Sequence, residues 1–507
     1  MFKKITLLGL FLCLTLGWAW AQQVLEYHVN LNDRSGDTFK VRLKNPKLSA
    51  NNEIYQFAST APGTYQVMDM GRFVRNFKAL DKAGKEIAVS QISTNQFKIS
   101  KPKAVQEIVY EIAETWDTPV SENRIYRMCG SSLEDDHALI NGQTVFGFPQ
   151  GMQNTPLKIK LEYPQEWQIG TPLEKDKAGF YLAKNYDFIV DSPILLGRLT
   201  FADTKVKGTD IELFTYSKTD KIKSAQLLEA MSQMLKAAGD FLQELPVKRY
   251  TFLFHFEDQS AGAWEHSYSS EYIYRESEWN ERLAKSITST AAHEFFHIIT
   301  PLNIHSEIIE NFNFVTPTAS EHLWLYEGTT EWASDFMQFR GGMITLEELF
   351  QELGTKILVN ERRFDPKYSL SQISLTSYTP EGQKQYGNVY MRGAIVAGLL
   401  DIRLLELSGG KRGLREVVLE LAKKYGPNKS FPEKEFFDVF TAMTYPEIGD
   451  FFKAYIRGAE PLPLAEYYAK IGILYSPSEN NQLPVFQLNP EATATQKALR
   501  EAWMKNL

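Results

Sequence analysis

The period of the hydrophobic pattern changes once along this 507-residue chain, at about residue 210. Before that point, segments such as LEYHVNL, TFKVRLK and EIVYEI alternate apolar with polar residues, and turn sequences such as NDRSGD separate them. This alternation is typical of antiparallel strands that bury one face. Beyond it, apolar residues recur at helical spacing in stretches 284–300, 319–340 and 384–408. We therefore expect a multidomain α+β protein with an N-terminal antiparallel β-sandwich-like domain.

The length of the chain exceeds what one hydrophobic core supports, so several domains are expected. We place the β domain at residues 22–202 and a domain of mixed strands and helices at 203–345. A helical domain follows at 346–475. The tail, 476–507, opens with SPSENNQ, a composition typical of linkers, and ends in one short helix.

Residues 1–21 have the composition of a secretory signal. MFKK is a basic start, ITLLGLFLCLTLGW is an apolar run, and Ala19-Trp20-Ala21 resembles a signal peptidase site. The alternative is a retained membrane anchor, although the run is short for a full span. We expect export to the periplasm or cell envelope, with no stable membrane insertion once the signal is removed.

Cysteine content and charge further restrict the class of protein and the kinds of partner that we expect. Cys13 lies within the expected signal, so Cys129 is the one cysteine of the mature chain and no internal disulfide can form. The net charge is −7 and no cluster of lysine and arginine occurs, which argues against nucleic acid as a partner. The oligomeric state is not predicted by the sequence.

The segment AAHEFFHIIT, residues 291–300, sets His293 and His297 four residues apart in an apolar run. Residues at i and i+4 share a helical face, so both imidazoles point the same way. Such a pair supplies two of the three protein ligands of a catalytic zinc, and the adjacent Glu294 could act as general base on a water that zinc acidifies. Chance produces the same spacing in roughly one of a hundred such chains.

A third ligand is expected on another helix. Glu327 follows the apolar residues 323–326, and a carboxylate buried there needs a cation or hydrogen-bond donors. Alternatively, Glu327 is an exposed glutamate on the surface of a helix. Glu331, one turn on, could orient a histidine ligand or be solvated. His305 and His322 are further histidines nearby, but the interrupted turn and the buried run around them favour Glu327 as the ligand.

These motifs resemble the glycyl aminopeptidase family of gluzincin, thermolysin-like zinc metallopeptidases. HEFFH, the glutamate of LWLYEG and the later YMRG carry the resemblance. Further similar segments are APGTYQVMDMGRFVRNFKA at 61–79, YDFIVDSPILLG at 186–197, GAWEHSYS at 262–269 and FFKAYIRGAEPLPLAEYYAKIGI at 451–473. The resemblance covers most of the expected mature chain in the same order. It implies a thermolysin-like zincin catalytic domain at 203–345.

Transferred to this sequence, the resemblance implies one zinc ion on His293, His297 and Glu327, with Glu294 as general base. Tyr390 would donate a hydrogen bond to the oxyanion, and Tyr386 is the second candidate for that role. Alternatively, Tyr390 is an aromatic residue of the hydrophobic core. Glu265 would bind the free amino group of a peptide substrate, and His266 would line the same pocket. Both could instead be surface residues at a strand end.

The chain departs from the family pattern in three ways. Residues 298–306 replace the usual Trp-Asn and basic residues after the second histidine, Ser267 stands where an arginine is usual, and we expect no C-terminal PDZ domain. The leading hypothesis is a zinc aminopeptidase that releases glycine or alanine from peptides. The alternatives are a zinc endopeptidase and a non-catalytic peptide-binding protein on a peptidase scaffold.

Overall fold

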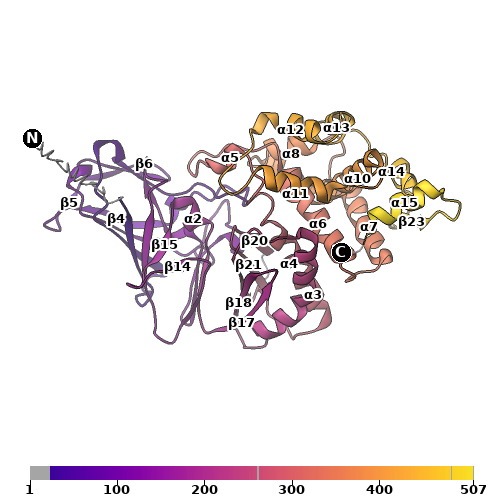
Figure 1. The fold of residues 1–507 in the computed structure, drawn as a ribbon. Helices are drawn as coiled ribbons and strands as arrows, with labels where there is room; N and C mark the ends of the chain where they lie inside the picture. Colours follow the sequence, from indigo (N-terminus) through magenta and orange to yellow (C-terminus); the bar gives the residue numbers. More distant parts are fainter. Residues whose placement is uncertain (1–22, 260–261, 481, 506–507) are drawn as a thin grey trace, which may run out of the picture.

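The computed structural model describes residues 23–259, 262–480 and 482–505. The predicted fold class is confirmed, since an antiparallel strand-rich part comes first and a helical part last. Figure 1 shows the strand-rich part in indigo and purple on one side and the orange helices on the other. The expected signal at 1–21 lies outside the described residues. Among the described helices, none combines the length and apolarity needed to cross a bilayer.

The largest sheet of the strand-rich part has eight strands in the order β14-β15-β12-β1-β2-β8-β4-β5. All neighbours are antiparallel except β1 and β12, which run parallel. In β1 every second side chain is buried, as the alternation predicts. The strands are β1 (Leu25–Asn30), β2 (Thr38–Lys44), β4 (Val74–Leu80), β5 (Glu86–Ile87), β8 (Glu107–Ala113), β12 (Leu157–Glu162), β14 (Glu174–Lys175) and β15 (Tyr181–Ala183).

Two four-stranded sheets, β11-β3-β7-β6 and β13-β16-β10-β9, complete this part. Their strands are β3 (Ile54–Gln56), β6 (Val89–Ser93), β7 (Gln96–Ile99), β9 (Ser132–Leu133), β10 (His137–Ile140), β11 (Phe148–Pro149), β13 (Gln168–Gly170) and β16 (Ile194–Gly197). Short helices connect them: η1 (Ala50–Asn52), η2 (Met70–Phe73), η3 (Pro102–Ala104), η4 (Arg127–Cys129), α1 (Gly142–Val145) and α2 (Tyr186–Val190).

A five-stranded sheet in the order β17-β18-β19-β21-β20 follows, with helices α3 (Ser224–Leu242) and α4 (Glu281–Phe296) packed together beside it. Its strands are β17 (Leu199–Val206), β18 (Thr209–Ser217), β19 (Arg249–Glu257), β20 (Gly262–Glu265) and β21 (Ser269–Arg275). Phe295 of α4 packs on Tyr250 of β19, and Phe296 packs on Phe241 of α3. Because successive helical residues are about 100° apart, His293 then faces away from the sheet.

The predicted helix 284–300 is shorter at its C-terminal end than expected. It ends at Phe296, and His297 caps it with helical dihedrals, φ −60° and ψ −16°. His297 therefore keeps its position one turn beyond His293. The predicted helix 319–340 divides into a π-helical turn, η5 (Trp324–Gly328), and α6 (Thr329–Arg340). In η5 the amide of Thr329 donates to the carbonyl of Trp324, five residues back. π-Helical turns are often found at functional sites.

The remaining helices form the orange and yellow part of Figure 1. Helix α10 lies at its centre, because it packs against α6, α7, α8, α11, α14 and η5. The helices are α5 (Glu307–Glu310), α7 (Leu346–Arg363), α8 (Leu370–Leu375), α9 (Pro380–Gln385), α10 (Asn388–Ser408), α11 (Leu414–Lys424), η6 (Glu433–Glu435), α12 (Phe436–Met443), α13 (Glu447–Phe452), η7 (Lys453–Arg457) and α14 (Leu464–Lys470).

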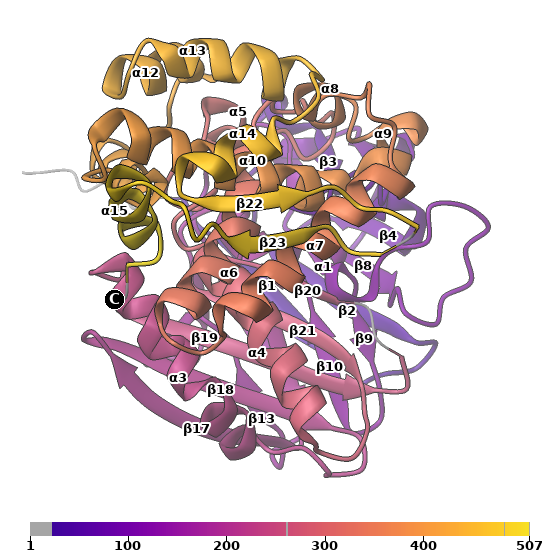
Figure 2. The same ribbon diagram turned by 90° about the vertical axis from the view of Figure 1, so that its right-hand side faces the viewer.

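The C-terminal segment contains a hairpin that the sequence did not predict. Strands β22 (Ile473–Ser476) and β23 (Val485–Leu488) are antiparallel, so the sequence SPSENNQ begins at the last residue of β22 and leads into the connection to β23. Phe486 stacks on Phe350 of α7, and Figure 2 shows the hairpin in front of that helix. Helix α15 (Ala494–Trp503) buries Trp503, whose carbonyl accepts hydrogen bonds from Arg340.

A glycine pair sets the distance between η5 and α10. A Cβ atom added to Gly393 would lie 2.7 Å from the Cα atom of Gly328. Only residues without a side chain allow the two backbones to approach this closely. Gly328 directly follows Glu327, and Gly393 lies three residues after Tyr390, so the pair also fixes how close these two side chains come.

Replacing Gly393 with alanine is expected to push α10 away from η5. We predict that Gly393→Ala lowers the free energy of unfolding by about 1–3 kcal/mol, the usual cost of overpacking. Gly398→Ala in the same helix is the matched control, because its Cβ would meet Trp332 at an ordinary 3.6 Å. Alanine there is expected to be neutral or to stabilise the helix by up to about 1 kcal/mol. Urea denaturation measures the free energy of unfolding of both variants. Equal values for Gly393→Ala and Gly398→Ala would contradict the close packing of η5 on α10.

Candidate metal centre

Helix α4 and the turn η5 bring two imidazoles and a carboxylate together. The Nε2 atoms of His293 and His297 each lie 3.5 Å from Oε2 of Glu327. All three residues are buried, and one ligand atom of each lies within 4.8 Å of the others. Atoms bound at about 2.0–2.2 Å to one tetrahedral zinc ion are roughly 3.4 Å apart. The three side chains could therefore share a single ion.

The Nδ1 atom of each histidine, which faces away from Glu327, has a hydrogen-bond partner. Nδ1 of His293 lies 2.8 Å from Oε2 of Glu331, and Nδ1 of His297 lies 2.8 Å from the carbonyl oxygen of Thr300. Both partners accept, so each Nδ1 donates, and each Nε2, on the side of Glu327, is the nitrogen that could bind an ion. The same arrangement fixes the tautomer of histidine ligands in metal sites.

The carboxylate behind His293 belongs to a buried ionic network. Nζ of Lys356 lies 2.9 Å from Oε1 of Glu331 and 2.8 Å from Oδ2 of Asp335. Burial alone would lower the pKa of Lys356, but the charges of Asp335 and Glu331 outweigh burial and raise it. Lys356 was not among the residues predicted to support the site. One signal was available, since Lys356 falls on the stripe of α7 that buries Leu349, Leu353 and Ile357.

The pocket in front of the histidines has a volume of about 390 Å³ and is strongly acidic. Glu265, Glu294, Glu327 and Glu331 line it, and its described lining contains no lysine or arginine. Burial raises the pKa of the Glu294 carboxyl to about 7, and the charges of Glu327 and Glu331 contribute to the rise. Buried carboxylates without a counter-charge are costly, so this donor set fits a divalent cation.

Glu265 lies at this pocket, whereas His266 does not line it. Glu265 ends β20, and one of its carboxylate oxygens lies within 4.8 Å of ligand atoms of Glu294 and His297. Burial raises the pKa of Glu265 well above its usual range, and Glu327 and Glu294 add to the rise. His266 instead lines an adjoining cavity of about 310 Å³, with Nδ1 3.6 Å from Asp191.

A loop of the N-terminal domain closes the pocket beside Glu265. A Cβ atom added to Gly63 would lie 2.5 Å from Oε1 of Glu265, and Gly63 has a φ of +81°. Its neighbour Tyr65 lies 5.3 Å from the ring of Tyr386. Both residues belong to the segment 61–79 that carries part of the family resemblance, but no sequence pattern indicated a role for either. Their position arises from contacts between residues some 200 positions or more apart, which no local pattern reveals.

Tyr390 of the YMRG segment and Tyr386, four residues before it, reach the same pocket. The ring of Tyr390 lies 5.7 Å from that of His293, and its hydroxyl lies 3.2 Å from the hydroxyl of Tyr386. Both line the acidic pocket. The further histidines lie elsewhere. His322 packs among Phe431, Phe436 and Phe437, and His305 lines the adjoining cavity.

Comparison with known families gives two matches. The Peptidase M61 N-terminal domain matches residues 26–198, and the M61 glycyl aminopeptidase domain matches residues 286–396. The second match contains the histidines, Glu294, Glu327 and Tyr390. A comparison with curated protein sequences finds no match.

Solved structures share the fold at low sequence identity. An aminopeptidase N family protein from Idiomarina loihiensis is 22% identical with a TM-score of 0.78, over 91% of this chain and 81% of that protein. An M1 zinc metallopeptidase from Deinococcus radiodurans is 12% identical with a TM-score of 0.55, over 87% and 95% of the two chains. A mutant M1 zinc metallopeptidase from the same organism, bound to a Tyr-Ser-Ala substrate, gives a TM-score of 0.53 at 10% identity over the same shares.

Removing the buried lysine is expected to destabilise the protein strongly. Lys356→Met leaves Glu331 and Asp335 buried without their cation, which costs about 3–5 kcal/mol of unfolding free energy. Lys285→Met is the matched control, because Lys285 pairs with Glu348 at 3.1 Å on the surface. Exposed pairs contribute about 0–1 kcal/mol. Urea denaturation gives the free energy of unfolding of both variants. If Lys356→Met lowers it no more than Lys285→Met does, the buried ionic network is contradicted.

Proposed function

Because the chain belongs to the M61 glycyl aminopeptidase family of zinc-dependent peptidases, we propose that it releases single residues from the free N-terminus of peptides. The proposal includes one zinc ion held by His293, His297 and Glu327. It also includes a preference for glycine or alanine as the first residue, which rests on family membership alone. The composition of residues 1–21 supports action outside the cytoplasm.

The placement of Glu265 is the observation that carries the exopeptidase assignment. A carboxylate within 4.8 Å of ligand atoms of Glu294 and His297 faces the same pocket as the three proposed zinc ligands. The described lining contains no lysine or arginine to pair with it. A substrate ammonium group would supply that charge, and charge-assisted hydrogen bonds between an ammonium and a carboxylate are strong. Gly63 and Trp264 enclose this end of the pocket, which supports a site for the end of a peptide.

Zinc bound by the three ligands supplies a Lewis acid, which polarises the scissile carbonyl and acidifies water. The chain's own side chains then handle the proton and the developing charge. Glu294 lines the pocket directly after the first histidine, so it is placed to take a proton from the attacking water and deliver it to the leaving amine. Burial keeps Tyr390 a neutral donor by raising its pKa, and its hydroxyl is placed to stabilise the oxyanion.

Hydrolysis of glycine and alanine 4-nitroanilides, free and N-acetylated, tests this proposal. Acetylation removes the ammonium and leaves Glu265 without its partner, so we expect kcat/KM to fall at least about 100-fold. Glu265→Gln is expected to raise KM for the free substrates by about 10–100-fold and to reduce the effect of acetylation. Leucine 4-nitroanilide is expected to be cleaved more slowly than the glycine compound.

Glu294→Gln is the matched control, because it makes the same chemical change in the same pocket. It is expected to lower kcat about 100- to 10,000-fold while KM and zinc content stay unchanged. Equal cleavage of acetylated and free substrates would contradict the exopeptidase assignment and favour an endopeptidase. A chain that binds peptides and zinc but cleaves neither substrate would favour the non-catalytic alternative.

A further inference from the structure

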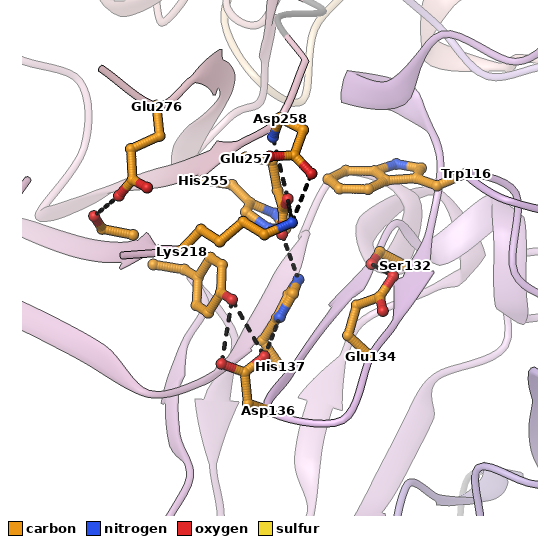
Figure 3. Close-up of polar contacts among 12 residues, drawn as sticks. Trp116, Ser132, Glu134, Asp136, His137, Lys218, His255, Glu257, Asp258 and Glu276 are labelled. Atoms are coloured by element: carbon orange, nitrogen blue, oxygen red, sulfur yellow. Dashed lines mark hydrogen bonds and ion pairs between the residues drawn. The ribbon is translucent and has the colours of Figure 1, made fainter. Parts of the chain in front are cut away.

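A second cluster of possible metal ligands lies outside the pocket of His293. It consists of His137 on β10 and of His255 and Glu257 near the end of β19, and Figure 3 shows the three side chains converging. None of them lines the acidic pocket. Strands β10 and β19 belong to different sheets, so the cluster joins the strand-rich part to the five-stranded sheet.

The distances resemble those of the first site. Nε2 of His137 lies 3.5 Å and Nε2 of His255 lies 3.9 Å from Oε1 of Glu257. One ligand atom from each residue falls within 4.8 Å of the others. The corresponding nitrogen–oxygen distances at the first site are both 3.5 Å. Ligands of one tetrahedral zinc ion are roughly 3.4 Å apart, so small movements would bring the three atoms onto one ion.

Three of the four ring nitrogens of this cluster are buried without a hydrogen-bond partner among the described residues. His137 is 2% and His255 is 1% exposed. Neither nitrogen of His255, nor Nε2 of His137, has a hydrogen-bond partner among the described residues. Leaving a buried polar atom unsatisfied costs about 1–3 kcal/mol. An ion that used the lone pairs of both rings would remove that cost at two of the three atoms.

His137 is already oriented as a metal ligand would be. Its Nδ1 lies 2.8 Å from Oδ1 of Asp136, which fixes the proton on Nδ1 and leaves the lone pair of Nε2 directed to Glu257. The hydroxyl of Tyr216 donates to the same carboxylate at 3.2 Å. Glu331 holds His293 in the same way at the first site. Carboxylate–histidine–metal relays of this form raise the affinity of a site for its ion.

We propose that His137, His255 and Glu257 form a second zinc site with a structural role. Two imidazoles and one carboxylate favour zinc or a similar transition metal over calcium or magnesium, which prefer oxygen ligands. No fourth histidine, cysteine, aspartate or glutamate atom of the described residues joins the set, so water would complete the coordination. The ion would join β10 to β19, where a small cluster provides the apolar contact: Trp116, Leu139, Leu195, Leu199, Tyr216, Leu253 and Ile273.

The competing interpretation is a metal-free ion pair. Nζ of Lys218 lies 3.2 Å from Oε2 of Glu257 and neutralises part of its charge. The same lysine lies 2.7 Å from Asp258, so it has a carboxylate partner whether or not Glu257 binds an ion. Lys218 approaches Oε2 of Glu257, whereas the histidines face Oε1. The lysine therefore leaves the nitrogens of the two rings unsatisfied.

Zinc content per chain tests the second site. We expect inductively coupled plasma mass spectrometry of the full chain, dialysed after zinc loading, to give two zinc ions in the wild type. Glu327→Ala and His255→Gln should each retain one, and the double variant none. His28→Gln is the matched control, because His28 pairs with Glu26 at 2.7 Å on β1 outside both clusters, and it should keep both ions. One zinc ion in the wild type, or no loss in His255→Gln, would overturn the proposal.

A second measurement does not depend on the folding of the His255 variant. Metal-stripped Glu327→Ala protein is titrated with zinc chloride by calorimetry, with circular dichroism as the check on its fold. One equivalent of zinc binding supports the second site, whereas no binding shows that the metal-free ion pair is the native arrangement. Because Glu327→Ala removes a ligand of the first site only, these outcomes are independent of whether the chain is an aminopeptidase.

Discussion

The concentration of negative charge in the acidic pocket is the constraint on which the rest of the structure depends. Four glutamates line the pocket, and its described lining contains no lysine or arginine. Such charges remain ionised in a protein interior only when cations or several donors accompany them. A divalent ion bound by His293, His297 and Glu327 would supply positive charge next to the Glu327 carboxylate. Lys356 already pairs with Glu331, and a further cation, such as a substrate ammonium, would balance Glu265.

The fold holds the proposed ligands through interactions on their far sides. Phe295 and Phe296 fix α4 against β19 and α3, which turns the histidines outward. The glycine pair lets η5 approach α10, so that Glu327 and Tyr390 face one pocket. Glu331 and Thr300 hold the two rings in one tautomer. Each proposed ligand is thus held by contacts with the protein, and such support makes a site bind its metal more tightly.

Local patterns allowed much of this to be predicted from the sequence. Alternation along β1 and helical spacing around His293 depend only on neighbouring residues, and a glutamate after a buried run indicates a need for a partner. The rest depends on distant contacts. Lys356 meets Glu331 from another helix, and Gly63 reaches Glu265 from another domain. The β22–β23 hairpin was missed because SPSENNQ reads equally well as a turn or a linker. His137 and His255 have no common motif, since β10 and β19 lie far apart in sequence.

Anomalous diffraction at the zinc absorption edge, from crystals of the wild-type chain, tests the central claim most directly. The proposed centre predicts a peak about 2.0–2.2 Å from Nε2 of His293, Nε2 of His297 and a carboxylate oxygen of Glu327. Density for zinc elsewhere with none at this point, or a Glu327 side chain turned out of the pocket, would contradict the metal centre and the hydrolytic function derived from it.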